Sequence, residues 1–363
     1  MANIEKADIE NLLKKFIDPN HGLDLVASKS VKAITVDGAQ VTVKLELGYP
    51  AKTYVDDLKV AVEQHLKALA GIDQVSVEVT VKIISHAVQQ ALKPHPNVKN
   101  IIAVASGKGG VGKSTTAVNL ALALAAEGAT VGILDADIYG PSIPTMLGLQ
   151  GYPVSEDNKT MIPKIAYGIQ TMSIGYLVDA GQAMIWRGPM VTNALLQLLR
   201  DTNWNNVDYL IVDLPPGTGD IQLTLSQQIP VSGAVIVTTP QDIALIDAQR
   251  GLGMFEKVNV PVLGIVENMS MHICSQCGHE EAIFGEGGGV TMALKNGVDF
   301  LGALPLDINI RKFADFGRPT VVSDPDGRAA QIYREIARKT AARLALKAKD
   351  FTTRFPTIVV QKT

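Results

Sequence analysis

Apolar and polar residues follow two different rhythms along the chain, and the first covers residues 1–92. Apolar residues recur at helical spacing in residues 5–16 and 54–69. Residues 31–47 alternate apolar and polar positions on either side of an Asp-Gly pair, which is typical of a β-hairpin. A further alternating run over residues 74–84 predicts another strand. This first rhythm therefore predicts a small α+β domain.

From residue 100 the rhythm changes to short apolar runs that alternate with helical stretches. The runs are IIAVAS, TVGILDAD, DYLIVDLPP, GAVIVTT and VPVLGIVEN. Continuously apolar strands between helices predict a central, mostly parallel sheet covered on both faces. We expect this α/β domain over residues 100–350, a proline-containing linker over 93–99 and a C-terminal tail over 351–363. Ligands of such sheets bind beyond the carboxyl ends of the strands.

The composition excludes several classes of protein. Of the 363 residues, 47% are hydrophobic, and the formal net charge is −3, so no basic surface is indicated for nucleic acid or an anionic membrane. No apolar run reaches the roughly 18 residues of a membrane span, and the first residues lack the apolar core of a signal peptide. Two cysteines cannot form a disulfide framework. We therefore expect a cytoplasmic protein with no nucleic-acid or membrane partner.

The loop after the first apolar run carries the pattern G-x-x-x-x-G-K-[ST]. In SGKGGVGKST the pattern follows the strand IIAVA and opens a helix, which is the context that a phosphate-binding loop requires. Backbone N–H groups and the helix N-terminus attract phosphate, Lys113 reaches the β- and γ-phosphates, and the Ser114 hydroxyl holds Mg²⁺. The loop predicts binding of ATP and Mg²⁺ by Gly107, Lys108, Gly109, Gly110, Val111, Gly112, Lys113, Ser114 and Thr115.

A second lysine, Lys108, marks a deviant form of this loop. The deviant form resembles that of the ATPases related to MinD, ParA and nitrogenase iron protein. In that group the extra lysine crosses a dimer interface and contacts the nucleotide of the partner chain. The resemblance implies a homodimer and a catalytic role for Lys108 and Lys113. The residues alone fit a solvated loop lysine equally well.

Three aspartates follow the strand-like runs. Asp135 and Asp137 lie two residues apart in LDADIYGPS, so in an extended strand both face the same way. Asp213 ends an apolar run in YLIVDLPPGTGD, the Walker B arrangement that holds Mg²⁺. By resemblance, Asp137 is the catalytic carboxylate that orients the attacking water, and Asp135 supports the strand end or the Mg²⁺ shell. We interpret residues 215–217, Pro-Pro-Gly, as a switch that senses the γ-phosphate.

Three further residues are assigned to the base of the nucleotide. Asn268 ends the strand VLGIVEN, where an amide can read the donor and acceptor edge of adenine. Pro305 and Asp307 follow FLGAL and are expected to flank the base. These assignments rest on the resemblance rather than on the residue pattern.

The two cysteines, Cys274 and Cys277, lie beyond the strand that ends at Asn268, in a loop with no periodicity. GKGGVGKST, DADIYGPS, WRGPM, VDLPPGTGD, ENMS with the downstream C-x-x-C, and FGEGGG together closely resemble the Mrp (ApbC-like) family of iron–sulfur cluster carrier P-loop ATPases. The resemblance implies an ATPase that holds a labile [4Fe–4S] cluster on the two cysteines and transfers it to apo-proteins. It also implies cluster-assembly scaffold proteins as partners. The small domain resembles an iron–sulfur assembly domain but has no cysteine of its own.

Two cysteines supply half of the four protein ligands that such a cluster takes. A homodimer with a two-fold axis brings two copies of the loop together and completes the set. One chain alone offers the alternative of a Cys₂His₂ zinc site with His272 and His279. A redox disulfide and two unreactive thiols are further alternatives.

Two readings of the whole protein compete with the cluster carrier. A MinD- or ParA-like positioning ATPase on membrane or DNA, with zinc on the cysteines, would use the basic amphipathic helix over residues 327–349. Such helices more often pack their apolar stripe on a sheet. A metabolic kinase would need a small-molecule pocket, for which the sequence shows no motif. Arg187 in IWRGPM fits either anion binding or an interface.

Overall fold

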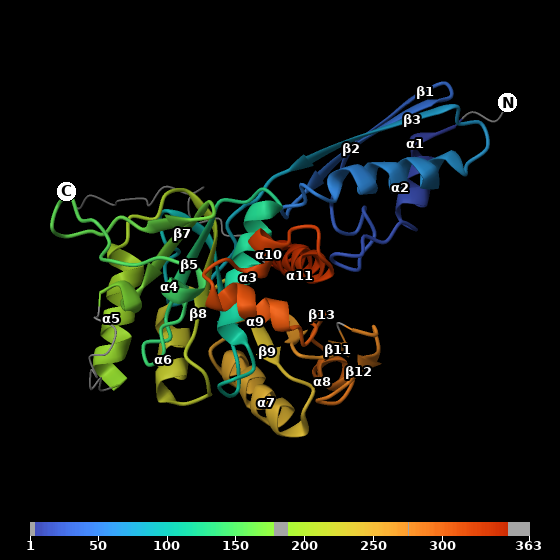
Figure 1. Cartoon of the computed structure of the whole chain (residues 1–363). Coiled ribbons are helices and arrows are strands. Elements are labelled where there is room, and N and C mark those ends of the chain that lie inside the picture. Colours follow the sequence, from blue (N-terminus) through green and yellow to red (C-terminus); the bar gives the residue numbers. More distant parts are fainter. Residues whose placement is uncertain (1–3, 178–187, 275, 348–363) are drawn as a thin grey trace, which may run out of the picture.

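The computed structural model describes residues 4–177, 188–274 and 276–347, and these form two units of different architecture (Figure 1). The N-terminal unit holds a three-stranded sheet in the order β1-β2-β3, with β1 antiparallel and β3 parallel to β2. Its elements are α1 (Lys6–Leu13), β1 (Val31–Asp37), β2 (Gln40–Leu47), α2 (Val55–Lys67) and β3 (Gln74–Val81). The expected small α+β domain is therefore present.

The packing of this unit follows directly from its apolar spacing. Every second residue of β2 from Val41 to Leu47 is buried, which gives the sheet one apolar face. The helix α2 buries Leu58, Val62 and Leu66 at intervals of four residues, which form one stripe. At the hairpin tip, Gly38 has a φ of 59°, a left-handed conformation that glycine adopts without strain.

The second unit is an eight-stranded sheet in the order β13-β10-β9-β4-β8-β5-β7-β6. Neighbouring strands are parallel except for β6 and β7, so the expected mostly parallel sheet is confirmed. The strands are β4 (Val98–Ala105), β5 (Val131–Asp135), β6 (Lys164–Ala166), β7 (Ile169–Ser173), β8 (Val207–Asp213), β9 (Gly233–Thr238), β10 (Val262–Glu267) and β13 (Phe300–Ala303).

Helices cover both faces of this sheet. One face carries α3, α10 and α11, and the other carries α5 to α8. The helices of the unit are α3 (Lys113–Ala126), α4 (Ile143–Met146), α5 (Gly188–Asp201), α6 (Asp220–Gln228), α7 (Asp242–Lys257), α8 (Gly288–Asn296), α9 (Ile308–Asp315), α10 (Thr320–Ser323) and α11 (Arg328–Ala345), with a 3₁₀ turn η1 (Ile174–Tyr176). The helix α11 buries Tyr333, Ile336 and Leu344 against the sheet and α3 rather than presenting an apolar stripe to a membrane.

The connection between the two units is longer than the expected linker over residues 93–99. Regular structure in the first unit ends at Val81, and β4 begins at Val98. Within this connection, His86 bonds to Asn100 of β4, and the Gln89 amide donates to the carbonyls of Ser226 in α6 and of Ile229 just after it. We therefore propose a boundary just after Val81 rather than at residue 92. The expected tail over residues 351–363 lies outside the described residues.

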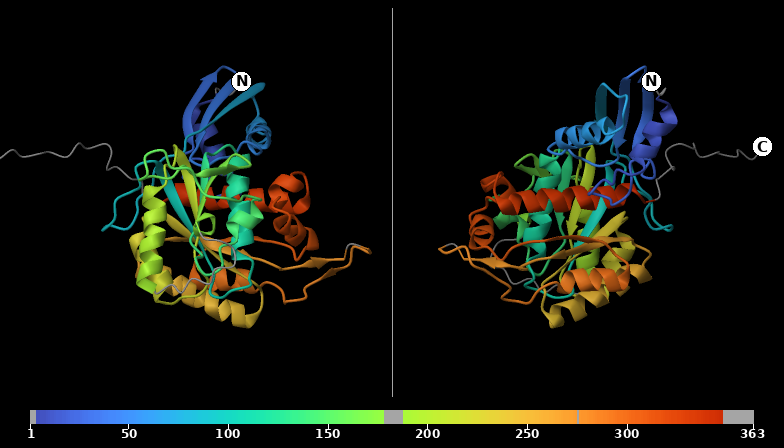
Figure 2. Two further views of the ribbon diagram at one scale, coloured as in Figure 1. Left: turned by 60° about the vertical axis from the view of Figure 1, so that its left-hand side comes forward. Right: turned by 90° about the vertical axis from the view of Figure 1, so that its right-hand side faces the viewer.

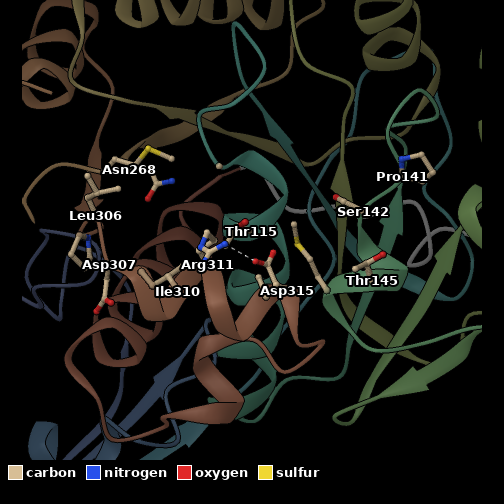
Figure 3. Close-up of a pocket in the computed structure, with 15 residues that line it drawn as sticks. Thr115, Pro141, Ser142, Thr145, Asn268, Leu306, Asp307, Ile310, Arg311 and Asp315 are labelled. Carbon is tan, nitrogen blue, oxygen red and sulfur yellow. Dashed lines mark hydrogen bonds and ion pairs between the residues drawn. The ribbon is translucent and has the colours of Figure 1, made fainter. Parts of the chain in front are cut away.

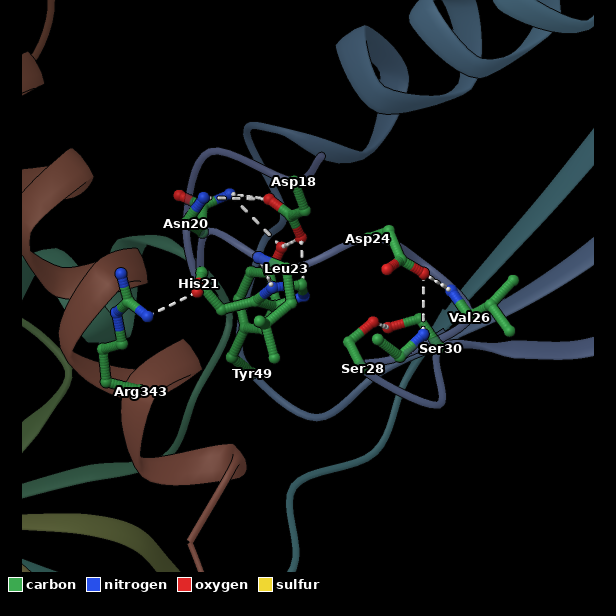
Figure 4. A network of polar contacts seen from close by, with 11 residues as sticks. Asp18, Asn20, His21, Leu23, Asp24, Val26, Ser28, Ser30, Tyr49 and Arg343 are labelled. Carbon is green, nitrogen blue, oxygen red and sulfur yellow. Dashed lines mark hydrogen bonds and ion pairs between the residues drawn. The ribbon is translucent and has the colours of Figure 1, made fainter. Parts of the chain in front are cut away.

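A polar cluster in the first unit faces α11 (Figure 4). The buried Asp18 accepts hydrogen bonds from the Asn20 amide and, at 2.5 Å, from the Tyr49 hydroxyl. The adjacent His21 is also buried, and its carbonyl accepts a hydrogen bond from the Arg343 guanidinium of α11. Burial lowers the pKa of His21, although the Asp18 carboxylate opposes this shift. The loop from Asp18 to His21 is thus a docking surface for α11.

A second joint between the units is a buried ion pair. The carboxylate of Glu127, at the end of α3, is fully buried and lies 2.5 Å from the Arg338 guanidinium. Glu127 also accepts hydrogen bonds from the backbone N–H and the hydroxyl of Thr53 in the first unit. The pair is therefore shared by α3, α11 and the N-terminal unit.

We predict that Arg338→Ala lowers the free energy of unfolding by roughly 3 kcal/mol, because it leaves the Glu127 charge buried without its partner. Chemical denaturation monitored by circular dichroism measures the change. Arg334→Ala is the matched control, since Arg334 donates only to the Pro325 carbonyl at an exposed position. Equal stability of the two variants would contradict the structural role of the pair.

Candidate functional site

The phosphate loop lies between β4 and α3, as the pattern predicts, and neighbouring elements pack closely on its glycines. A Cβ atom on Gly107 would lie 2.1 Å from the carbonyl carbon of Asp247 in α7. A Cβ atom on Gly112 would lie 2.2 Å from the side-chain nitrogen of Asn268, and Gly112 also has a φ of 81°. Only glycine fits these two positions, which leaves the backbone N–H groups of the loop open to a ligand.

Lys113 lies at the centre of the site, and its side chain is only 6% exposed. Its Nζ lies 2.6 Å from Asp213 Oδ1, 3.1 Å from Ser114 Oγ and 3.6 Å from Asp137 Oδ2. Lys113 therefore brings together three other residues that were assigned from the sequence: Ser114, Asp137 and Asp213. Two carboxylates balance the buried charge of Lys113, as a buried cation requires.

Strand order brings the aspartates together. The strands β5 and β8 are neighbours, and Asp135 pairs with Asp213 in their register. Asp135 is fully buried, and burial together with the Asp213 charge raises its pKa to about 7. It accepts hydrogen bonds from the backbone N–H of Asp137 and from the Ser173 hydroxyl. Asp135 therefore supports the turn that presents Asp137. The carboxylate of Asp135 is engaged in these structural hydrogen bonds.

The other two carboxylates are available for chemistry. Asp213 Oδ2 is buried and has no hydrogen-bond partner among the described residues. This orphaned buried oxygen and the Ser114 hydroxyl, which both belong to residues that contact Lys113 Nζ, are of the oxygen type that Mg²⁺ prefers. Burial raises the pKa of Asp137, and the Lys113 charge opposes this shift. Asp137 is partly exposed, so water can reach it.

A pocket of about 420 Å³ adjoins the phosphate loop (Figure 3). Thr115, Asn268, Pro305 and Asp307 line it, so the three assigned base contacts lie together with the loop. Two of these side chains have structural partners: the Asn268 amide donates to the Val111 carbonyl at 2.9 Å, and Asp307 caps α9. The sequence analysis missed the α9 wall, which adds Ile310, Arg311, Ala314 and Asp315.

The cysteines lie in a loop, as expected, and this loop joins the two short strands of a ribbon. The ribbon consists of β11 (His272–Ile273) and β12 (Glu280–Glu281), and it projects from the sheet domain in orange in Figure 2. At its tip the Cys274 carbonyl accepts the N–H of Gly278, which has a φ of 72°. A two-residue strand carries too little periodicity to be recognised in the sequence.

The tip presents both thiols to a ligand. Cys274 is half-buried and Cys277 is exposed. Backbone N–H groups of Gln276 and Cys277 point to the Cys274 sulfur and lower its pKa, so they favour the thiolate that binds metals. Among the described residues no three His, Cys, Asp or Glu side chains form a group that could hold a metal ion.

Two other sequence interpretations have limited structural counterparts. No helix in the described part of the chain is both long and apolar enough to cross a membrane. Arg187, for which anion binding was considered, lies outside the described residues.

Comparisons with known proteins match both units. A family model described as NUBPL iron-transfer P-loop NTPase matches residues 97–341, and one described as iron-sulfur cluster assembly protein matches residues 6–79. The chain is 51% identical over 343 residues to the iron-sulfur cluster carrier protein of Escherichia coli K12, covering 93% of this chain and 92% of that protein. It is 54% identical over 254 residues to the iron-sulfur cluster transfer protein NUBPL of Mus musculus, covering 69% and 80% respectively.

Solved structures share the fold of the second unit. A nucleotide-binding protein of Archaeoglobus fulgidus in complex with ADP, in which cobalt was found, has a TM-score of 0.57 and 38% identity and covers 65% of this chain and 92% of its own. The cell-division ATPase MinD of Pyrococcus furiosus has a TM-score of 0.50 and 23% identity, with coverages of 66% and 97%. The second likeness concerns the fold alone.

We predict that Lys113→Ala weakens nucleotide binding by roughly 100-fold, because it removes the charge-assisted hydrogen bonds to phosphate. Titration with a fluorescent ATP analogue measures the affinity. The matched control is Lys99→Ala. Lys99 forms an ion pair with Asp208 near the amino ends of β4 and β8, and it does not line the nucleotide pocket. Unchanged affinity in Lys113→Ala would mean that the loop does not bind phosphate.

Proposed function

The chain belongs to the family of NUBPL-type iron-transfer P-loop NTPases, and on this premise we propose how it carries iron–sulfur clusters with the help of ATP. One observation carries the proposal. A phosphate loop and a pair of thiols on a projecting ribbon occur in one chain, and the residues that lead into the ribbon, Asn268 and Met269, line the nucleotide pocket. The chain is an ATPase and an iron–sulfur cluster carrier. The positioning ATPase is disfavoured because the relatives that cover most of the chain are named iron–sulfur cluster carrier and transfer proteins.

Each side chain at the phosphate loop has a distinct task in ATP hydrolysis. The loop N–H groups and Lys113 hold the phosphates, and Ser114 and Asp213 would hold Mg²⁺. The metal would neutralise charge on the β- and γ-phosphates. Asp137 orients the attacking water. Its carboxylate can also accept a proton from that water, because the pKa of Asp137 is raised above its ordinary value. The 215–217 loop is tied to the phosphate loop by a hydrogen bond from Gly217 N–H to the Ser106 carbonyl, which suits a switch.

We predict that Asp137→Ala slows ATP hydrolysis by about 100-fold or more while ATP affinity stays within roughly threefold. The reason is that Asp137 lies at the margin of the phosphate site and contacts Lys113 only at 3.6 Å. Phosphate release measures the rate, and analogue titration measures the affinity. Asp157→Ala, a change in an exposed turn, serves as the control. Hydrolysis at the unmodified rate would show that another group positions the water.

The cluster is cargo, and one chain provides only two thiolates for it. We propose that two chains related by a two-fold axis place their ribbons together, so that four thiolates bind one [4Fe–4S] cluster. The same dimer would let Lys108 reach the nucleotide of the partner chain. Apo-proteins that require the cluster would be the recipients, scaffold proteins the donors, and the cytoplasm the location.

We predict about four iron atoms per dimer in protein prepared without oxygen. Size-exclusion chromatography with iron and zinc measured on each peak tests this, because the cluster should be confined to the dimer. Cys274→Ser and Cys277→Ser should each lose the iron and keep ATP binding, since neither thiol lines the nucleotide pocket. One zinc per monomer, unaffected by dilution, would contradict the shared site.

A further inference from the structure

The cysteine ribbon and the base end of the nucleotide pocket are joined by hydrogen bonds. The backbone N–H and the hydroxyl of Ser270 both donate to the Leu304 carbonyl at 3.0 Å. The Leu306 N–H donates to the Met271 carbonyl at 2.8 Å. The chain leading into the ribbon therefore runs beside residues 304–306 as a short parallel ladder, which ends in a bridge between His272 and Leu306.

The last contact of this ladder involves a side chain. The Nδ1 atom of His272 lies 3.1 Å from the Leu306 carbonyl oxygen. A carbonyl oxygen only accepts hydrogen bonds, so Nδ1 carries the proton in this contact. His272 is the residue two positions before Cys274, and it is half-buried. It is therefore the side chain that joins the start of the thiol tip to the segment 304–306.

The two joined segments are also walls of the nucleotide pocket. Asn268, Met269, Pro305 and Leu306 all line it, and Figure 3 shows Asn268 and Leu306 on the same side of the pocket. Asn268 additionally holds the Val111 carbonyl of the phosphate loop. A ligand in the pocket therefore contacts the same residues that position the first strand of the ribbon.

The far end of the ribbon is fixed independently of the pocket. The buried Glu267, at the end of β10, accepts a hydrogen bond from the Gly289 N–H at 2.6 Å. This bond joins the two ends of the segment that carries the ribbon, residues 268–288, at its base. Among the described residues, the tip has no such support from outside the ribbon apart from an exposed pair between Glu280 and Arg328, which contributes little. The orientation of the tip thus depends mainly on the ladder along the pocket wall.

We propose that His272 is a positioning residue that couples the base end of the nucleotide pocket to the thiol pair within one chain. Nucleotide binding orders residues 268–269 and 305–306. The His272 hydrogen bond then restricts the motion of the tip that carries Cys274 and Cys277. A ligand of the two thiols then has less ordering to supply, so the two ligands strengthen each other. This inference rests on the proposed function, because it assigns the dependence of cluster binding on ATP to one hydrogen bond, between His272 and the Leu306 carbonyl.

The test uses a probe that needs neither iron nor a dimer. Phenylarsine oxide condenses with two thiols of one chain, forming two As–S bonds and releasing the arsenic-bound oxygen as water, with no change of oxidation state. Its affinity for the full-length, cluster-free protein is measured by calorimetry at one fixed pH, with and without a non-hydrolysable ATP analogue. We expect the analogue to tighten probe binding by about fivefold or more. No change, or weaker binding, would overturn the inference.

Variants identify the contact. His272→Ala should reduce the effect of the analogue to less than about twofold, while each ligand alone still binds. His279→Ala, a change of the other ribbon histidine, should keep the full effect. His272→Asn restores an N–H donor near Nδ1 and should recover most of it. Full coupling in His272→Ala, or loss of coupling in His272→Asn together with normal folding, would exclude the hydrogen bond as its carrier.

Two further comparisons separate this inference from the rest of the proposal. Lys108→Ala removes the proposed contact between chains, so coupling that survives in this variant is intrachain, as the inference requires. Coupling that disappears in Lys108→Ala would assign it to the dimer instead and overturn the role of His272. The absence of iron from the purified dimer would refute the cluster proposal and leave the probe measurements unaffected.

Discussion

The second unit depends on one electrostatic constraint: a lysine buried at the edge of a parallel sheet must be balanced there. Lys113 is balanced because β8 lies between β4 and β5, so that the Walker B carboxylate of Asp213 ends beside the phosphate loop. The same strand order places Asp135 next to Asp213, and two carboxylates so close cannot both be ionised cheaply. Burial and this repulsion raise the pKa of Asp135 to about 7. The site therefore holds its carboxylates in unequal roles, one supporting and two facing the ligand.

A second constraint is the number of thiols in one chain. One chain has two cysteines, and both are on a ribbon whose tip is directed away from the domain body. Backbone N–H groups already favour the thiolate form of Cys274, so the tip is prepared for a soft metal before any metal arrives. Under the proposed sharing of one cluster by two chains, such a site would be incomplete in one chain and complete in two. Incompleteness suits a carrier, because separation of the chains takes away half of the ligands and lowers the barrier to transfer.

Much of this could be predicted from the sequence, for identifiable reasons. The strand, glycine-rich loop and helix around Lys113 are contiguous, so local pattern is sufficient to recognise them. Asp213 was expected to hold Mg²⁺ at a strand end, and its contact with Lys113 agrees with the carboxyl-edge rule for parallel sheets. The α9 wall of the pocket was not found, since Arg311 and Asp315 come from a short amphipathic helix whose position is set by tertiary packing. The partnership of Asn268 with Val111 was missed because an amide has both donor and acceptor and the sequence does not show which neighbour it meets.

The position of the ribbon in the chain links the thiol-bearing segment to the phosphate loop. The excursion begins directly after Asn268, which touches the phosphate loop, and its first strand is laid against residues 304–306 of the pocket wall. A ribbon inserted after β5 or β7 would project from the other side of the sheet order and would share no wall with the base. The cost of holding Met269 in a left-handed conformation, at a φ of 57°, falls at the residue that joins the pocket to the ribbon. Backbone strain of this kind persists only where the surrounding structure enforces it, and here the Asn268–Val111 hydrogen bond and the ladder along residues 304–306 hold the junction from both sides.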